Sequence, residues 1–254
     1  MNVRVERDGA VTIVIIDRPN ARNAVDPPTA LGLREAFEAF EADEATPIAV
    51  LTGAGDHFCS GFDLKAVSSA VGRHDPDGDG PMGPTRRLLS KPVIAAVEGY
   101  AVAGGLELAL WCDLRVASAT AVFGVFCRRW GVPLIDGGTV RLPRIVGQGR
   151  ALDMILTGRP VDATEALDFG LVNRLVAAGE ARVEAVRLAT EIARFPELCL
   201  RTDRASAFAQ WPLPLDEALR AEARGGEAPL RVGAREGAAR FAGGLGRSGN
   251  FDEI

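Results

Sequence analysis

The sequence has few of the side chains that bind metal ions. Among its 254 residues there are only two histidines, His57 and His74. The four cysteines lie far apart and form no C-x-x-C pair: Cys59, Cys112, Cys127 and Cys199. Zinc and iron–sulfur sites need several such ligands at short, regular spacing. We therefore expect no metal site, and the isolated cysteines favour a reduced, cytoplasmic protein.

Positive charge is also scarce. The chain has 29 lysines and arginines against 34 aspartates and glutamates, which gives a formal net charge of −5. A nucleic-acid-binding protein needs a basic surplus to neutralise phosphates, so the sequence predicts no nucleic-acid partner. Lysine occurs only at Lys65 and Lys91, and we attach no function to this preference for arginine.

Long uncharged apolar runs are absent. The first residues, "MNVRVERDGAV", lack the apolar core of a secretory signal, so we expect none. Residues 93–111 are mostly apolar, but they include Glu98, Glu107 and three glycines. A carboxylate at the centre of a bilayer costs about 2.5–3.5 kcal/mol. This segment is therefore predicted to be a buried strand, a glycine turn and a buried helix, with no membrane partner.

The residues that are present indicate a globular α/β protein, with 47% hydrophobic and 25% charged side chains. "VRVERDGAVTIVIID" predicts a hairpin turning at Asp8–Gly9. The predicted strands and helices then alternate, and after Phe195 the pattern is helical, with a break at 211–215. We expect a core over 1–195 and a helical C-terminal segment over 196–254. Further helices are predicted over 27–43, 147–157, 162–169 and 180–195, and a buried strand over 47–53.

Residues 67–84 are rich in Gly, Pro, Ser and Asp and show no periodicity. A stretch of this length and composition predicts a mobile loop over a binding site. We expect a bound ligand to order it.

One carboxylate, Glu107, stands among apolar residues in "GYAVAGGLELALWCD" (99–113). If a helix starts near Gly104, its first amides are free and lie at the positive end of the helix dipole, which suits an oxyanion. Gly104 and Gly105 would let a ligand approach, and "FCSGFD" (58–63) could present a second free amide. A glutamate in a first helical turn is also a common capping residue, so spacing alone leaves catalysis and capping open.

Four segments in order resemble the signatures of the crotonase superfamily, the enoyl-CoA hydratase/isomerase family. They are "FCSGFDLK" (58–65), "KPVIAAVEGYAVAGGLELALWCDLRVAS" (91–118), "FGVFCRRWGVPLIDGGTVRLPRIVG" (123–147) and "ALDFGLVNRLV" (166–176). The resemblance implies a spiral of ββα units followed by a helical C-terminal segment that forms trimers, often stacked into hexamers. It also implies an acyl-CoA substrate, with coenzyme A as part of that substrate and no separate cofactor.

The resemblance implies roles for individual residues. The backbone N–H groups of Phe62 and Gly104 would hold the thioester oxygen and stabilise an enolate. Glu107 matches the first of the two catalytic glutamates of family hydratases, and burial should raise its pKa. Further residues are expected at the substrate: Ser60, Asp63, Leu64, Lys65, Cys127 and Phe241. For Lys65, an ordinary solvated charge is the alternative.

The sequence departs from the family hydratases at the second glutamate, where "FGVFC" places Cys127. A thiol, with a reference pKa near 8.5, is a poor substitute for a carboxyl group that protonates carbon. Asp136 falls where family dienoyl-CoA isomerases carry an additional acid, although it could instead cap a helix that follows it. Arg128 and Arg129 could meet an acidic acyl substituent, although structural ion pairs at a subunit contact are the favoured alternative.

Three functions stay open. The leading one is an enoyl-CoA hydratase-type lyase with Glu107 as acid and base, helped by Asp136 or by no second acid. A double-bond isomerase needs only one base and is the second. A non-catalytic acyl-CoA-binding protein, inactive because the second glutamate is missing, is the third.

Overall fold

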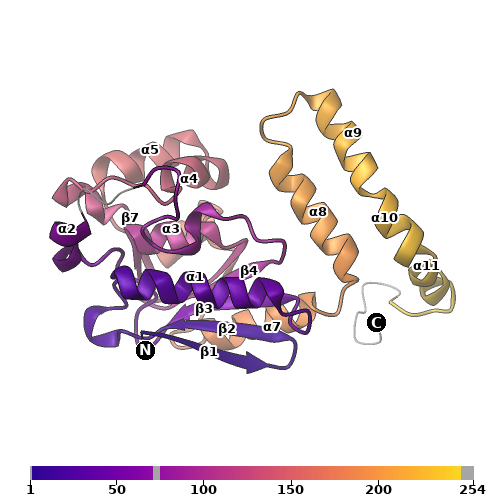
Figure 1. The fold of residues 1–254 in the computed structure, drawn as a ribbon, viewed down its shortest axis with the longest axis horizontal. Coiled ribbons are helices and arrows are strands. Elements are labelled where there is room, and N and C mark those ends of the chain that lie inside the picture. Colours follow the sequence, from indigo (N-terminus) through magenta and orange to yellow (C-terminus); the bar gives the residue numbers. More distant parts are fainter. Residues whose placement is uncertain (1, 71–74, 247–254) are drawn as a thin grey trace. The chain divides into compact units, whose positions relative to one another are not determined.

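The computed structural model describes residues 2–70 and 75–246 (Figure 1). The chain divides into two compact units, Met1–Thr190 and Glu191–Ile254. Every strand in the described ranges belongs to the first unit. No helix in those ranges is long and apolar enough to cross a membrane.

The first unit is built on a six-stranded sheet with the order β1-β2-β3-β4-β6-β9. β1 and β2 pair antiparallel, with Asp8 opposite Val11, which confirms the predicted hairpin; the other neighbours are parallel. Parallel strands covered on both faces are usually continuous apolar runs. β2 to β4 fit this rule, since only one of their residues is not fully buried. The strands are β1 (Val3–Asp8), β2 (Val11–Ile16), β3 (Ile48–Gly53), β4 (Val93–Val97), β6 (Leu114–Ser118) and β9 (Arg174–Val176).

A second sheet has three strands in the order β5-β7-β8. They are β5 (Tyr100–Val102), β7 (Val122–Gly124) and β8 (Val161–Asp162). The chain passes from β4 almost directly into β5 and then into helix α3 (Gly104–Trp111). It makes a similar step from β6 into β7. These steps are the ββα units that the resemblance implies.

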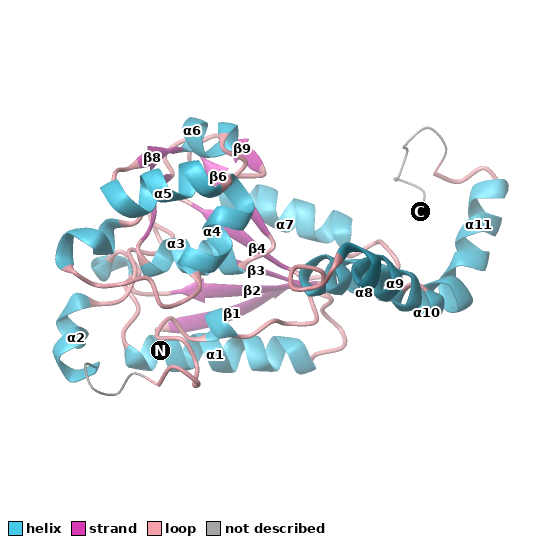
Figure 2. Ribbon diagram, turned by 90° about the horizontal axis from the view of Figure 1, so that it is seen from above, coloured by secondary structure: helices cyan, strands magenta, loops and turns pink. Residues whose placement is uncertain are grey.

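Helix α1 (Pro27–Ala42) matches the helix predicted over 27–43. It starts where Asp26 accepts a hydrogen bond from the Thr29 N–H at 3.0 Å, and two prolines occupy its first positions, as is typical of a helix start. Figure 2 shows α1 along the face of β1 and β2, and Leu33, Phe37 and Phe40 are buried there. The later helices of the first unit are α4 (Gly138–Val146), α5 (Gln148–Thr157), α6 (Ala163–Asp168) and α7 (Ala181–Ile192).

The segment 67–84 is better packed than its composition suggests. Helix α2 (Leu64–Ala70) takes up its first part, and residues 71–74 lie outside the described ranges. From Asp75 onward, Arg86 Nη1 donates to the carbonyl oxygens of Asp75, Pro76 and Gly78 at 2.7–3.1 Å. An arginine beyond the segment thus holds the carbonyl groups of this part, and the ordering of 67–84 by a bound ligand stays a prediction.

The second unit is helical, as predicted for the residues after 195. It contains α8 (Glu197–Ala209), α9 (Leu215–Gly225), α10 (Glu227–Pro229), a π-helical turn η4 (Leu230–Ala234) and α11 (Arg235–Ala242). The break between α8 and α9 matches the one predicted at 211–215. No described residue of these helices is buried, and several large apolar side chains are exposed: Leu198, Phe208, Trp211, Leu215, Leu219, Leu230, Val232 and Phe241.

Candidate active site

Two backbone amides, those of Phe62 and Gly104, lie where the chain enters helices α2 and α3. Cys59 and Ala101 form a parallel bridge between neighbouring chain segments. Phe62 and Gly104 each follow that bridge by three residues, so the shared register brings them side by side. A Cβ on Gly61 would lie 3.0 Å from the Gly104 nitrogen, which shows how closely the two turns approach. Neither the Phe62 nor the Gly104 N–H donates to an acceptor within the described residues. Both are therefore available to a ligand oxygen.

The backbone before Gly104 is strained. Ala103 has φ +53°, a left-handed value that residues with a side chain seldom adopt. Strain of this kind is concentrated at functional sites. The first two residues of α3 are glycines because there is no space for a side chain: a Cβ on Gly105 would meet the Cys59 carbonyl oxygen at 2.1 Å, and one on Gly104 would meet Met82 Sδ at 2.6 Å. Gly104 also lines the cavity described below, whereas Gly105 does not belong to its wall.

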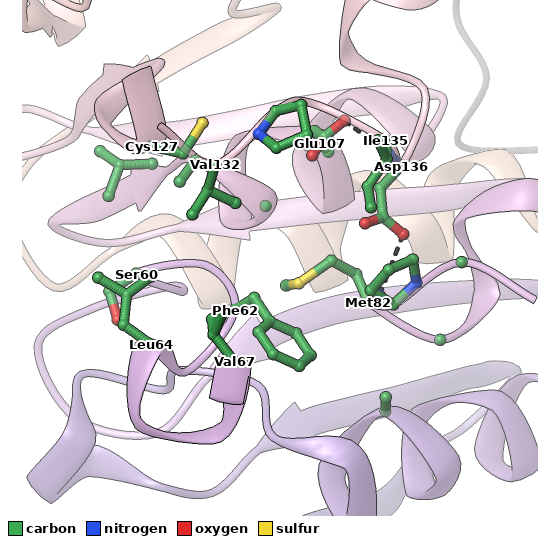
Figure 3. A pocket seen from close by; sticks show the side chains of 18 of the residues that line it. Ser60, Phe62, Leu64, Val67, Met82, Glu107, Cys127, Val132, Ile135 and Asp136 are labelled. Carbon is green, nitrogen blue, oxygen red and sulfur yellow. Dashed lines mark hydrogen bonds between the residues drawn. The ribbon is translucent and has the colours of Figure 1, made fainter. Parts of the chain in front are cut away.

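Glu107 lies in the first turn of α3 with only 2% of its surface exposed. Its Oε1 accepts a hydrogen bond from the backbone N–H of Asp136 at 2.9 Å (Figure 3) and another from that of Gly138 at 2.8 Å. Burial raises the pKa of Glu107 to about 7, and the negative charge of Asp136 adds to the rise. A carboxyl group with this pKa can take up or release a proton near neutral pH.

Asp136 is the second buried carboxyl group of the site, with 3% of its surface exposed. Its Oδ1 accepts a hydrogen bond from the Met82 N–H at 3.0 Å and a short one from the Thr85 hydroxyl. Burial raises its pKa, against the lowering effect of these bonds. The capping interpretation of Asp136 is wrong. The residue before α4 is Gly137, and the free amide of Gly138 is bound by Glu107.

Arg141 on α4 stabilises the two carboxyl groups of Glu107 and Asp136 without lining the cavity itself. Its Nη1 donates to the Asp136 carbonyl oxygen at 2.9 Å and its Nη2 to the Thr85 carbonyl oxygen at 2.6 Å. The positive charge lowers the pKa of both Glu107 and Asp136, but by less than burial raises it. The positive charge of Arg141 thus partly offsets the repulsion between the two carboxyl groups in this buried site.

Cys127 lies on the 3₁₀ turn η3 (Phe126–Trp130) and is 7% exposed. Burial, followed by the charge of Glu107, raises the pKa of its thiol. The thiol is therefore neutral at physiological pH and cannot stand in for a carboxylate. Figure 3 shows Cys127 and Glu107 beside the same cavity.

These groups line one cavity of about 980 Å³, at the upper end of the range for small-molecule sites. Glu107, Asp136, Cys127, Phe62 and Gly104 all contribute to its wall. Most of the remaining lining is apolar. The cavity thus combines two unpaired amides, two carboxyl groups and space for an apolar chain.

The other residues expected at the substrate divide into two groups. Ser60 and Leu64 line the cavity, whereas Asp63 and Lys65 do not belong to its wall. Asp63 instead accepts hydrogen bonds from the Lys65 N–H at 3.1 Å and from Arg18 at 3.1 Å, so it serves the start of α2. Phe241 lies on α11 in the second unit and is 61% exposed; its contact with a ligand stays a prediction.

Arg128 and Arg129 do not belong to the cavity wall either. Arg128 Nε donates to the carbonyl oxygen of Ile155 at 3.1 Å, and Arg129 Nη2 to that of Gly158 at 2.9 Å. Both side chains therefore bind the last turn of α5. Their pairing with an acidic acyl substituent, or with acidic residues at a subunit contact, stays a prediction.

Several lining residues had no role in the sequence analysis: Arg22, Arg34, Met82, Tyr100 and Trp130. Tyr100 is the single tyrosine of the chain and directly follows the first glycine of the site motif, so its position was a usable signal. Met82 gave none, because it lies in the aperiodic stretch. No group of three or more metal-binding side chains occurs within the ranges that the structure describes.

Comparison with known proteins agrees with this geometry. The family model "Enoyl-CoA hydratase/isomerase" matches residues 6–244. Enoyl-CoA hydratase EchA19 of Mycobacterium tuberculosis is 37% identical over 246 residues, 94% of this chain and 92% of that protein. Carnitinyl-CoA dehydratase of Proteus mirabilis is 39% identical over 195 residues, 76% and 74% of the two chains. A crystal structure of an enoyl-CoA hydratase from Mycobacterium tuberculosis superposes with a TM-score of 0.88 at 35% identity, covering 95% and 96%.

Fold and site together define a protein of the crotonase fold. The chain belongs to the enoyl-CoA hydratase/isomerase family. Both the predicted fold class and the family resemblance are thus confirmed.

Proposed function

We propose that the chain is an enoyl-CoA hydratase, a lyase that adds water across the double bond of a 2-enoyl-CoA thioester. One observation carries this proposal. Two buried carboxyl groups with raised pKa values, those of Glu107 and Asp136, share one cavity with the unpaired amides of Phe62 and Gly104. The names of the relatives, which are hydratases and dehydratases, support the same class of reaction.

In the proposed reaction the amides of Phe62 and Gly104 bind the thioester oxygen. They polarise the conjugated double bond and stabilise the enolate that forms when it is attacked. Ionised Glu107 takes a proton from a water molecule, and the water oxygen bonds to the β-carbon. Protonated Asp136 gives its proton to the α-carbon. Transfer of a proton from Glu107 to Asp136 returns the pair to its starting state, so that one water has been added.

The two carboxylate oxygens of Glu107 have different surroundings, which supports this assignment. Oε1 accepts two backbone hydrogen bonds, which fix the side chain. Oε2 makes no hydrogen bond with the described residues. It is also absent from the side-chain atoms that are both buried and without a partner, so it is accessible. It is therefore open to the cavity, where a substrate or water can reach it.

The isomerase stays the second candidate, because one observation favours it. Cys127 is neutral where hydratases of the family carry a glutamate, so no carboxylate occupies that position of the cavity wall. Moving a double bond requires one base to carry one proton between two carbons, and Glu107 alone could do this.

Parallel assays separate the candidates. Crotonyl-CoA and a 3-enoyl-CoA are incubated with the enzyme, and the products are identified by mass and by chromatography. A hydratase adds the mass of water to crotonyl-CoA. An isomerase converts the 3-enoyl thioester without a change in mass. A protein that only binds leaves both unchanged while still binding a saturated acyl-CoA in a calorimetric titration, and that result would overturn the proposal.

A further inference from the structure

Helix α1 forms one long side of the cavity. Four of its residues line it at helical spacing: Pro27, Ala30, Leu31 and Arg34. The helix begins next to the oxyanion amides, because Val25 forms a parallel bridge with Phe62. At 1.5 Å per residue, Arg34 lies about 10 Å further along the helix than Pro27. The side chains therefore change from apolar to cationic with distance from the thioester position.

The Arg34 end lies on the side of the catalytic acids. Arg34 Nη1 donates to Asp79 Oδ2 at 2.8 Å. The next residue, Gly80, is so close to Asp136 that a Cβ on it would lie 2.3 Å from Asp136 Oδ1. A chain that extends from the amides past Asp136 thus reaches Arg34. In the proposed reaction Asp136 protonates the α-carbon, so the rest of the acyl chain would continue in this direction.

The guanidinium of Arg34 has N–H donors that bind no acceptor among the described residues. Only Nη1 makes a hydrogen bond within the described part of the chain. Nε is buried without a partner, so a ligand in the cavity does not reach it, and the carboxylate of Glu38 lies 3.8 Å away. Nη2 donates to no acceptor in the same ranges and is not one of the buried atoms that lack a partner. Nη2 is therefore the donor that a ligand oxygen can use, in a charge-assisted hydrogen bond.

The wall around Arg34 is held in place before any ligand binds. Asp79 is bound a second time by Arg87, whose Nε lies 2.9 Å from Oδ1. Arg86 fixes the turn that carries Asp75, and Gly83 donates to the Gly80 carbonyl oxygen at 2.8 Å. A preorganised polar wall is what a specific subsite requires.

The charges at this end limit what it can accept. Arg34, Asp75 and Asp79 are the charged side chains that line it. A carboxylate on the acyl chain would approach Arg34 but would also face two negative charges. An ammonium group would face the guanidinium. An uncharged oxygen can accept from Arg34 without either repulsion.

We propose that the cavity holds a 2-enoyl-CoA whose acyl chain ends in an uncharged oxygen-bearing group, a hydroxyl or a carbonyl, and that Arg34 binds that oxygen. This inference rests on the proposed function and adds its substrate class. Since an extended chain gains roughly 1.2 Å per bond, about eight bonds span the 10 Å along α1. The matching acyl chain is of medium length.

Binding of saturated thioesters tests the proposal without requiring turnover. Octanoyl-CoA, ω-hydroxyoctanoyl-CoA, ω-carboxyoctanoyl-CoA and ω-trimethylammonio-octanoyl-CoA are titrated calorimetrically at one ionic strength. The hydroxy compound should bind about tenfold more tightly than octanoyl-CoA, the magnitude of one hydrogen bond to a charged group. The two charged compounds should show no such gain.

Two variants that each remove a cation with two carboxylate partners locate the effect. Arg34→Met removes the cavity cation, and the preference for the hydroxy compound should fall to about one. Arg4→Met removes a cation of β1 that pairs with Glu6 and Asp17 outside the cavity wall, so the preference should persist. Equal binding of octanoyl-CoA and its hydroxy analogue by the unaltered protein would overturn the inference, as would a preference that survives Arg34→Met. Tighter binding of the carboxy or trimethylammonio compound would overturn it too.

Failure of the proposed function gives a different result. A protein that hydrates crotonyl-CoA but shows no preference among the octanoyl compounds is a hydratase without the Arg34 subsite. A protein that binds none of the four thioesters overturns both proposals. One that binds with the expected preference but has no activity keeps the subsite and loses the reaction.

Discussion

Glu107 and Asp136 form one connected unit, in which a carboxylate oxygen of Glu107 accepts the backbone N–H of Asp136 at 2.9 Å. The same oxygen binds the Gly138 N–H, so Glu107 caps the start of α4 from another helix. Capping and the proposed catalysis, which were alternatives for this residue in the sequence, would use different oxygens of one side chain. The first oxygen binds the two amides, and the second makes no hydrogen bond with the described residues.

Replacing Glu107 with Gln should keep the shape and remove the proton transfer. We expect turnover of 2-enoyl-CoA to fall by a factor of about 10²–10⁴, the usual contribution of one acid–base group. Acyl-CoA affinity should change little, because the amides of Phe62 and Gly104 remain. Steady-state kinetics and a calorimetric titration measure the two quantities. Full activity of Glu107→Gln on every enoyl-CoA would show that Glu107 is only a capping residue.

The raised pKa of Glu107 should also appear in the stability of the protein. Its pKa is about 7 in the folded state against a reference value of 4.5, so the folded protein binds more protons between these values. This group therefore stabilises the fold below about pH 4.5, and its contribution is lost as the pH rises to about 7. The loss amounts to about 3 kcal/mol.

Urea unfolding of the parent protein and of Glu107→Gln at pH 5 and pH 8 isolates this effect, since all other titrating groups are common to both. The free energy of unfolding of the parent should fall, relative to the variant, between the two pH values. An unchanged difference would mean that Glu107 titrates normally in the fold.

Thr85 should position Asp136. Its hydroxyl donates to Asp136 Oδ1 and thereby lowers the pKa of that carboxyl group. Thr85→Val removes the donor at nearly constant volume, so the pKa of Asp136 should rise and kcat should fall about tenfold. Thr85→Ser keeps the hydroxyl and should restore both. The dependence of kcat on pH provides the readout, and identical profiles for Val and Ser would contradict the role.

Gly80 should not tolerate a side chain. A Cβ there would lie 2.2 Å from Thr85 Oγ1 and 2.3 Å from Asp136 Oδ1, so Gly80→Ala must displace the carboxyl group proposed as the acid. We expect a destabilisation of about 1–3 kcal/mol, as for other overpacked sites, and loss of most activity. Gly149→Ala is the matched control. That position in α5 has no atom within 4 Å of the added carbon, and alanine should stabilise the helix by up to about 1 kcal/mol. Equal activity of the two variants would refute the constraint at Gly80.

We propose that the chain forms a homotrimer or a dimer of trimers through its C-terminal helices. Apolar side chains such as Leu215, Leu219 and Phe241 are 77%, 55% and 61% exposed, and exposed apolar surface of this kind marks contact sites. Light scattering coupled to size-exclusion chromatography at micromolar concentration should give three or six times 26.8 kDa. A monomeric mass would contradict the proposal.

The sequence by itself determined the order of the elements and the main residues of the site. Periodicity, caps and turn residues act between neighbours in the chain, so the hairpin at Asp8–Gly9 and the helix after Asp26 could be predicted locally. "GGLE" and "SGFD" likewise carry Phe62, Gly104 and Glu107 in fixed positions after their strands.

Tertiary structure decided what depends on partners far away in the chain. Asp136 looked like a cap for the helix that follows it, but its carboxyl group binds Met82 and Thr85, more than fifty residues earlier. Its expected capping role fell to Glu107, since any buried acceptor close to a helix start can bind the free amides there. The wall at Arg34 was equally hidden. Helix α1 and the aperiodic segment 75–83 meet there through tertiary packing. No pattern within either stretch of sequence predicts that contact.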